Sequence, residues 1–314
     1  MLDNSRNECR PISLGLIGLG RQGRRHLLSA TQLARDQALR IDALVDIDPQ
    51  CSILAKQSNI PFYASVDAMP ATIDACVIAT PTQTHLAVAS AVLERRIDVL
   101  LEKPVAATLA QTRALVRLAE QNDCIFQVGY LERYHSAFTL NRPDFSLPTQ
   151  IFSNRSTTGR SIQTLSELVL ELMIHDLDML AAWLNREPIE MRWSRLRCKP
   201  DKVGGRLDLL FTDGHRAQLF AESGVGRAVR QTVVNSAIHS WNFSWAHGGA
   251  AHPQSPAYTD QNQSGQTIDD PLSRQLRAFV QAVRTRTRPM IDGESALKAM
   301  RLAERAILAL PVAA

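Results

Sequence analysis

Short apolar runs alternate with amphipathic stretches along roughly the first 130 residues. The runs have the length of buried strands, and the stretches between them repeat apolar residues at helical spacing. Strands are predicted at Ile12–Ile17, Arg40–Val45, Ile73–Ala79, Ile97–Leu101 and Cys124–Gly129, and helices at Arg21–Arg35, Pro49–Gln57, Thr84–Arg95 and Thr108–Gln121. This order predicts an α/β domain, a parallel sheet with helices on both faces.

The pattern changes in the second half of the chain. An apolar helix is predicted over 165–184, and two amphipathic helices are predicted near the end, at Pro271–Arg284 and Glu294–Leu310. Between them, strands are predicted at Glu190–Arg197, Arg206–Phe211, His215–Glu222 and Ala228–Asn235, and a polar loop at His247–Gln266. We therefore expect domains at 1–126 and 127–314. The second is an α+β domain with a mostly antiparallel open sheet, and helices 271–310 can pack back on the first.

Four ionisable residues interrupt the apolar helix predicted over 165–184. They are Glu171, His175, Asp176 and Asp178, in the stretch ELMIHDLDML. Burying such groups without partners is costly, so each needs a use. Helical spacing places Glu171, His175 and Asp178 along one side and turns Asp176 elsewhere, where it can anchor structure.

A glycine motif follows the first predicted strand, ISLGLI, and opens a helix. Gly18, Gly20 and Gly23 match G-x-G-x-x-G, with Gln22 inside the motif. The first glycine permits a tight turn, the second lets a pyrophosphate approach the backbone, and the third lets helix and strand pack closely. The motif predicts a dinucleotide at the helix N-terminus, where free N–H groups favour an anion. A purely structural glycine turn is the alternative.

An acidic residue ends the second predicted strand. Asp46 can accept hydrogen bonds from a ribose diol and repel a 2′-phosphate, which favours NAD over NADP. Asp48 competes for this contact, although it also precedes Pro49 in the position of a helix cap. Arg21, Arg24 and Arg25 follow the glycines and can flank the pyrophosphate or lie on an exposed helix face.

Two further segments lie where predicted strands end. ATPTQTH contains Thr80, Pro81 and His85, and EKP contains Glu102 and Lys103. Ligands of open α/β sheets bind beyond the carboxyl ends of the strands, so both segments are expected to face the cofactor. For Lys103, a surface position or an ion pair with Glu102 remains an alternative.

Composition narrows the class of protein. The five cysteines are scattered without CxxC spacing, which indicates a reducing cytoplasm and disfavours zinc or a disulfide framework. The polar N-terminus is unlike a signal peptide, and no apolar run reaches the length of a membrane span. A net charge of +4 suits an anionic small molecule better than nucleic acid, although an ordinary solvated surface explains it nearly as well.

Taken together, the motifs resemble the glucose–fructose oxidoreductase/inositol dehydrogenase family of NAD(P)-dependent sugar dehydrogenases. The matching pieces, in the family's order, are GLIGLGRQGRRH, VDIDP, ATPTQTH, EKP, VGYLERYHSAF and ELMIHDLD. GYLERYHSAF and ELMIHDLD are further similar to segments of family members that oxidise the 3-hydroxyl of UDP-N-acetylglucosamine. Here His135 and Ser136 stand where that segment has Asn-Pro, and Glu171 where it has Asp.

The resemblance implies roles for three residues. Lys103 is the acid/base, supported by Glu171 and His175, and a lysine near a positive nicotinamide ring has the lowered pKa that suits a base. His175 can bind the sugar hydroxyl or relay its proton, and Glu171 can fix the histidine tautomer. From spacing alone, a structural polar pair or a zinc site remains open for Glu171 and His175, although no further ligand cluster is apparent.

Arginines and aromatic residues complete the set of candidates. Arg133, Arg155 and Arg160 are expected to bind the diphosphate of a UDP-sugar, or else to pair with surface carboxylates. Tyr130 and Tyr134 can pack on the sugar or in the core. The segment from Trp241 to His247, with Trp245 and nearby His239, can form an active-site lid or a subunit contact.

The resemblance thus implies a cytoplasmic NAD-dependent UDP-sugar dehydrogenase, forming a homodimer or homotetramer and supplying an aminotransferase, in some bacteria for lipid A. We expect no metal, nucleic-acid partner or membrane. One alternative is a dehydrogenase of a free cyclitol or sugar such as an inositol. The other is a non-catalytic sensor that binds a dinucleotide on the same fold.

Overall fold

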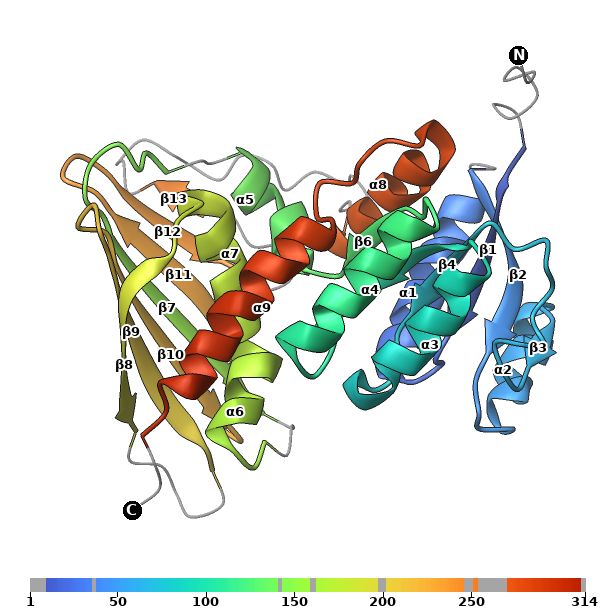
Figure 1. The fold of residues 1–314 in the computed structure, drawn as a ribbon, viewed down its shortest axis with the longest axis horizontal. Coiled ribbons are helices and arrows are strands. Elements are labelled where there is room, and N and C mark those ends of the chain that lie inside the picture. Colours follow the sequence, from blue (N-terminus) through green and yellow to red (C-terminus); the bar gives the residue numbers. More distant parts are fainter. Residues whose placement is uncertain are drawn as a thin grey trace. The chain divides into compact units, whose positions relative to one another are not determined.

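The structure, a computed structural model, describes residues 10–35, 38–140, 143–158, 162–196, 202–245, 251–253 and 270–311. These residues form two compact units. Unit 1 comprises the described residues up to Tyr130 together with Leu272–Leu297. Unit 2 comprises the described residues of Leu131–Pro271 and those from Lys298 onward. Each unit is built around one sheet (Figure 1).

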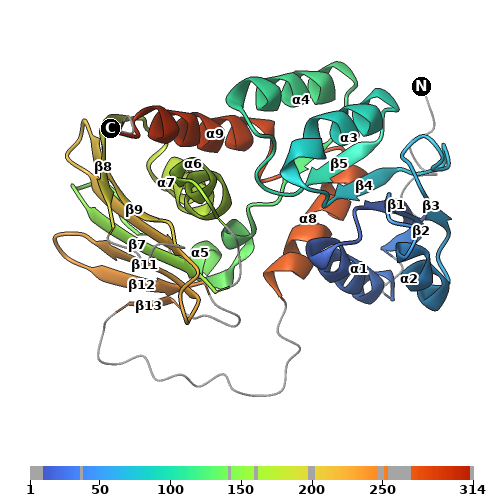
Figure 2. The same ribbon diagram turned by 90° about the horizontal axis from the view of Figure 1, so that it is seen from below.

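Unit 1 contains a six-stranded parallel sheet in the order β3-β2-β1-β4-β5-β6. Its strands are β1 (Ile12–Ile17), β2 (Leu39–Val45), β3 (Phe62–Tyr63), β4 (Ala75–Ile78), β5 (Asp98–Leu101) and β6 (Phe126–Val128). Its helices are α1 (Arg21–Ala34), α2 (Cys51–Ser58), α3 (Thr82–Glu94), α4 (Leu109–Gln121) and α8 (Pro271–Thr285), with the start of α9 (Gly293–Leu308). Figure 2 shows α3 and α4 on one face of this sheet and α1 and α8 on the other. The predicted α/β Rossmann fold is confirmed.

The core of unit 1 explains its continuous apolar strands. All six residues of β1 are buried because helices cover both faces of the sheet. Leu14 and Leu16 of β1 belong to one cluster with Leu27 of α1 and with Leu276 and Phe279 of α8. The core that holds the glycine turn thus combines the beginning of the chain with a helix from near its end.

Unit 2 contains a seven-stranded sheet in the order β13-β12-β11-β7-β10-β9-β8. Its strands are β7 (Gln150–Thr157), β8 (Pro188–Arg195), β9 (Gly204–Phe211), β10 (Arg216–Ser223), β11 (Val229–Asn235), β12 (Ser240–Ser244) and β13 (Ala251–Pro253). Among these strands only β7 and β10 pair in parallel, so the predicted mostly antiparallel sheet is confirmed. Helices α6 (Leu165–Leu168) and α7 (Ile174–Leu184) and the later turns of α9 lie on one face of it (Figures 1 and 2).

The helix predicted over 165–184 is present, but one of its turns is π-helical. The π turn spans Val169–Met173, between α6 and α7, and contains Glu171. Such turns insert an extra residue into an α-helix and are frequent at functional sites. Thr164 begins the helix by accepting a hydrogen bond from the Glu167 amide.

Strand β7 lies centrally in the sheet of unit 2 and was not predicted from the pattern. Ile151 points toward the helices, as expected, but Ser153 and Arg155 occupy the next inward positions and are buried. Polar residues at inward positions remove the alternation by which strands are recognised. Most of the predicted loop His247–Gln266 lies outside the described residues. No helix within the described ranges is long and apolar enough to cross a membrane.

Candidate functional site

The glycine turn between β1 and α1 has the geometry of an anion cradle. Gly18 has φ of +88°, and a Cβ there would lie 2.8 Å from backbone atoms of Ala79 and Thr80. A Cβ on Gly23 would lie 1.8 Å from the Gly18 carbonyl oxygen, so α1 can approach β1 only with glycine at this position. A Cβ on Gly20 would meet no protein atom within 4 Å. The space above Gly20 is therefore left for a ligand.

A cavity of about 820 Å³ opens beside this turn. Of the residues predicted to bind the cofactor, Gly18, Gly20, Asp46, Thr80 and Pro81 line it. The wall is completed by Ile17, Leu19, Arg21, Arg24, Val45, Ile47, Asp48, Cys51, Ala64, Ser65, Val66, Ala79, Thr84 and Val88. The segment 64–66 follows the two-residue strand β3, too short to show periodicity, and was missed. The glycine cradle, the helix N-terminus and a carboxylate on the wall fit a dinucleotide.

The two aspartates at the end of β2 have separate roles. One carboxylate oxygen of Asp46 accepts a hydrogen bond from the Leu19 amide at 2.6 Å and the other from the Asp48 amide at 2.9 Å. Asp46 is thereby fixed at the cavity wall, and its ribose contact stays a prediction. Asp48 accepts from the Gln50 amide at 2.9 Å, in the turn that leads into α2.

His85 connects the two strand-end segments. Its ring nitrogens lie 2.9 Å from the Pro104 carbonyl oxygen and 2.8 Å from that of Thr80. The side chain is buried and does not line the cavity. His85 thus holds the cofactor-facing segments together, rather than contributing its ring to the cavity wall.

Glu102 lies at the centre of a buried cluster behind the glycine turn. His26 Nε2 donates to Glu102 Oε1 at 2.6 Å, and Gln22 Nε2 donates to the same oxygen at 2.9 Å. Burial raises the pKa of Glu102, but the bond and charge of His26 outweigh burial and hold this pKa below its ordinary value. The cluster ties α1 to the backbone of half-buried Lys103, whose amide donates to Glu102 Oε2 at 3.3 Å.

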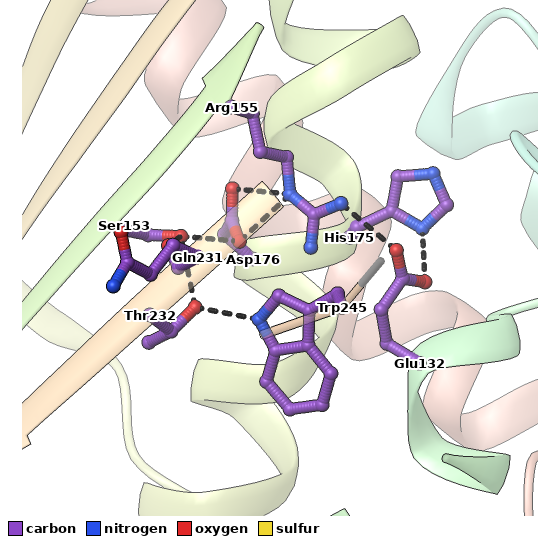
Figure 3. A network of polar contacts seen from close by, with 8 residues as sticks. All are labelled: Glu132, Ser153, Arg155, His175, Asp176, Gln231, Thr232 and Trp245. Atoms are coloured by element: carbon purple, nitrogen blue, oxygen red, sulfur yellow. Dashed lines mark hydrogen bonds and ion pairs between the residues drawn. The ribbon is translucent and has the colours of Figure 1, made fainter. Parts of the chain in front are cut away.

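In unit 2 the partner of His175 is a residue that the sequence did not suggest. Nδ1 of His175 lies 2.6 Å from Oε2 of Glu132, which belongs to the 3₁₀ turn Leu131–Tyr134. The side chain of Glu132 is 7% exposed and that of His175 is 15% exposed. Figure 3 shows the second ring nitrogen turned away from Glu132. The tautomer-fixing role predicted for Glu171, which lies in the π turn, stays a prediction.

Arg155 holds Glu132 in place. Its Nη1 donates to Glu132 Oε1 at 2.8 Å, and its Nε donates to both carboxylate oxygens of Asp176 at 2.8 and 2.9 Å. The Arg155 side chain is only 3% exposed, and its guanidinium lies between Glu132 and Asp176 (Figure 3). The diphosphate contact predicted for Arg155 stays a prediction, while in this structure Nη1 and Nε of the guanidinium bind carboxylates. Asp176 anchors structure, as its position on the helix predicted.

The network continues from Asp176 into the sheet. Ser153 Oγ donates to Asp176 Oδ1 at 2.7 Å and lies 3.1 Å from the hydroxyl of Thr232. That hydroxyl accepts from the indole of Trp245 at 2.9 Å. Trp245 is buried and its ring stacks on Phe243, with centroids 5.4 Å apart. Trp245 therefore belongs to the core of unit 2 and not to a lid.

Arg133 and Asp178 form a second ion pair in unit 2. Arg133 Nη1 lies 3.3 Å from Asp178 Oδ1, and both side chains are largely buried. Burial raises the pKa of Asp178 to about 7, although Arg133 opposes this shift. Arg160 and His247 lie outside the described residues. Within the described part of the chain, no group of three or more His, Cys, Asp or Glu side chains could hold a metal ion.

Comparisons with known proteins find similar sequences and a similar fold. Residues 12–130 match the model of an oxidoreductase family with an NAD-binding Rossmann fold. The chain is 24% identical over 298 residues to UDP-N-acetylglucosamine 3-dehydrogenase of Acidithiobacillus ferrooxidans, covering 89% of this chain and 91% of that one. A solved structure of that enzyme has a TM-score of 0.83 at 22% identity, covering 95% of this chain and 97% of that one. Inositol 2-dehydrogenase of Rhizobium meliloti is 23% identical over 57% of each chain.

Proposed function

Because residues 12–130 match the model of an oxidoreductase family with an NAD-binding Rossmann fold, we propose that this protein is an NAD-dependent sugar dehydrogenase acting on a UDP-sugar. Its substrate is UDP-N-acetylglucosamine, which it oxidises at the 3-hydroxyl to the 3-keto sugar. The observation that carries this proposal is the likeness to a UDP-N-acetylglucosamine 3-dehydrogenase, which extends through both units and covers 89% of the chain.

Oxidation of a secondary alcohol requires removal of one proton and one hydride. NAD, when bound, accepts the hydride from the sugar carbon. In our proposal Lys103 accepts the hydroxyl proton, and the C–O single bond becomes the carbonyl of the product. The Lys103 backbone amide donates to Glu102, which fixes the point from which the Lys103 side chain extends. A positioned side chain of this kind can accept the hydroxyl proton.

The proposed role of unit 2 is to bind the sugar. His175 would contact the reacting hydroxyl through the ring nitrogen turned away from Glu132. Arg133, whose side chain is 13% exposed, remains a candidate for the diphosphate, as does Arg160. The expected product is a ketone, which a pyridoxal-dependent aminotransferase could convert to an amine. We also propose a homodimer or homotetramer.

NADH absorbance tests the proposal directly. Purified protein with NAD and UDP-N-acetylglucosamine should form NADH, and an aminotransferase that consumes the ketone should raise the yield. Lys103→Met should lower turnover by about 10²- to 10⁴-fold with NAD binding retained. Absence of turnover with every UDP-sugar would contradict the proposal, and a cellular role that survives Lys103→Ala would favour a non-catalytic sensor.

A free cyclitol is the second candidate substrate, because inositol 2-dehydrogenases are among the relatives. Thermal unfolding in the presence of NAD distinguishes the two. A UDP-sugar enzyme should be stabilised by UDP alone and further by UDP-N-acetylglucosamine, since a ligand that binds only the folded state raises the unfolding temperature. Stabilisation by myo-inositol and not by UDP would favour the cyclitol.

A further inference from the structure

The strongest unexplained feature of unit 2 is the buried charge around His175. Arg155 carries one positive charge, whereas Glu132 and Asp176 carry one negative charge each. Arg155 binds both carboxylates, so these three side chains together hold one surplus negative charge. Each of the three is at least nine-tenths buried, where an uncompensated charge is costly.

Arg155 donates to both carboxylates, and a neighbouring cation favours the ionised form of each. Ser153 and Arg155 donate to the oxygens of Asp176. Burial is the largest influence on Asp176 and leaves its pKa above the ordinary value, although Arg155 and Ser153 oppose the rise. Burial likewise raises the pKa of Glu132, but the charges of His175 and Arg155 outweigh it and hold this pKa well below its ordinary value. The surplus charge therefore belongs to Glu132, on the side that faces His175.

From this geometry we infer that Glu132 is a positioning residue that keeps His175 protonated, so that His175 presents a cationic hydrogen-bond donor to the substrate. Nδ1 of His175 and Oε2 of Glu132 are 2.6 Å apart, a separation at which a protonated ring and a carboxylate form an ion pair. With His175 protonated, the four side chains are electrically neutral. Arg155 and Asp176 act further back, because they fix the carboxylate of Glu132.

This charge state has a consequence that rests on the proposed function. A protonated imidazole has no lone pair to accept the hydroxyl proton, so that proton must go to Lys103. His175 instead stabilises the negative charge that develops on the sugar oxygen as the proton leaves. In the reverse direction the same N–H polarises the carbonyl. His175 is thus an electrostatic catalyst and not a base.

Other charged groups lie on the same two elements as His175 and Glu132. On its own helix the ionisable groups are Glu171, Asp176 and Asp178, and on the turn Leu131–Tyr134 they are Glu132 and Arg133. The charge of Asp178 is offset by Arg133 at 3.3 Å. Glu171 is half-buried, where water screens its charge more than that of Glu132. It therefore provides the matched control.

The test is an NMR titration of His175 in the protein without substrate, which requires no activity. In the wild type the ring should titrate above the ordinary histidine value of about 6.5. Glu132→Gln, which keeps the shape of the side chain and leaves a neutral cluster, should lower the midpoint by about 1 to 3 pH units. Glu171→Gln should lower it by less.

A wild-type midpoint below the ordinary value would overturn the inference, whether or not the variant folds. Equal shifts in the two variants would also overturn it, because the effect would then be a general field and not the contact with Glu132. If the protein proves inactive on every UDP-sugar while His175 titrates as expected, the proposed function fails and the pairing stands. In an active enzyme, Glu132→Gln should move the lower limb of the pH profile, which a merely structural role would not do.

Discussion

The two units contain the same pair in different surroundings. In unit 1 His26 Nε2 lies 2.6 Å from Glu102, and in unit 2 His175 Nδ1 lies 2.6 Å from Glu132. The ring of His26 is fully buried, whereas that of His175 is 15% exposed. Glu102 also accepts a hydrogen bond from the neutral amide of Gln22, whereas Glu132 accepts one from the charged guanidinium of Arg155. The first pair is enclosed and joins elements of unit 1, while the ring of the second is partly exposed.

The largest difference between the two pairs should appear in catalysis. His175→Asn should lower turnover on the proposed substrate by about 10²- to 10⁴-fold, because in our proposal His175 contacts the reacting oxygen. His26→Asn should leave turnover per folded molecule within a few-fold and act mainly on stability. Steady-state kinetics at saturating NAD, normalised to the folded fraction, would measure both. Equal losses would remove the distinction between the pairs.

The free energy of unfolding should depend on which side chain supports the glutamate of each pair, Arg155 for Glu132 and Gln22 for Glu102. Arg155→Met leaves two buried carboxylates without their cation, so we expect a loss of about 3–5 kcal/mol in the free energy of unfolding. Gln22→Met removes a neutral donor to Glu102 and a part-buried acceptor for Arg25, and should cost about 1–2 kcal/mol. Urea denaturation of both variants gives the comparison. A smaller loss for Arg155→Met would contradict the strong coupling we describe.

Acid should weaken the pair of Glu132 and His175 more steeply than the pair of Glu102 and His26. The pKa values of Glu102 and Glu132 are both lowered by folding, that of Glu132 more strongly. A depressed carboxyl pKa contributes stability above the unfolded value of about 4.3, and this contribution is lost as pH falls through the folded pKa. Glu132→Gln should therefore flatten the dependence of unfolding free energy on acid pH more than Glu102→Gln does, by about 1–3 kcal/mol. Denaturation between neutral pH and pH 3 would measure it.

The smallest effect is expected at the far end of the unit 2 network. Thr232→Val removes the hydroxyl that accepts from Trp245 and lies beside Ser153, and should cost about 1 kcal/mol. In unit 1, Thr112→Val removes a buried hydroxyl bonded only within its helix and should cost less. Neither change should shift the titration of His175. A shift in Thr232→Val would extend the electrostatic network into the sheet.

The parts of the molecule that follow simple periodicity could be predicted from the sequence. Strand β1 is buried throughout because helices cover both faces of the sheet. The turn that follows it requires glycine at positions 18 and 23, where a Cβ would clash with the backbone. These features are local, so a short stretch of sequence contains them. The helix over 165–184 was predicted for the same reason, although nothing in its spacing indicated the π turn.

The network of unit 2 could not be predicted in this way. Glu132, Arg155 and His175 are distant in sequence, and their meeting depends on β7, whose polar inward residues concealed the strand. One available signal was missed: Glu132 lies in VGYLERYHSAF, a segment already singled out by its resemblance to the family. The i, i+4 rule drew attention to Glu171 instead, because sequence spacing reveals partners only within one helix.

The late arrival of α8 has a consequence for how the protein is made. Leu276, Phe279 and Val280 belong to the core that also contains β1 and α1, yet they lie more than 240 residues after those elements. During synthesis the first Rossmann strands leave the ribosome long before the helix that covers them exists. Most of unit 2 must be translated while one face of that sheet is still bare. A nascent chain stalled before α8 should therefore be a target for chaperones and proteases. The sheet should be protected from them only once α8 has been synthesised and has packed on it.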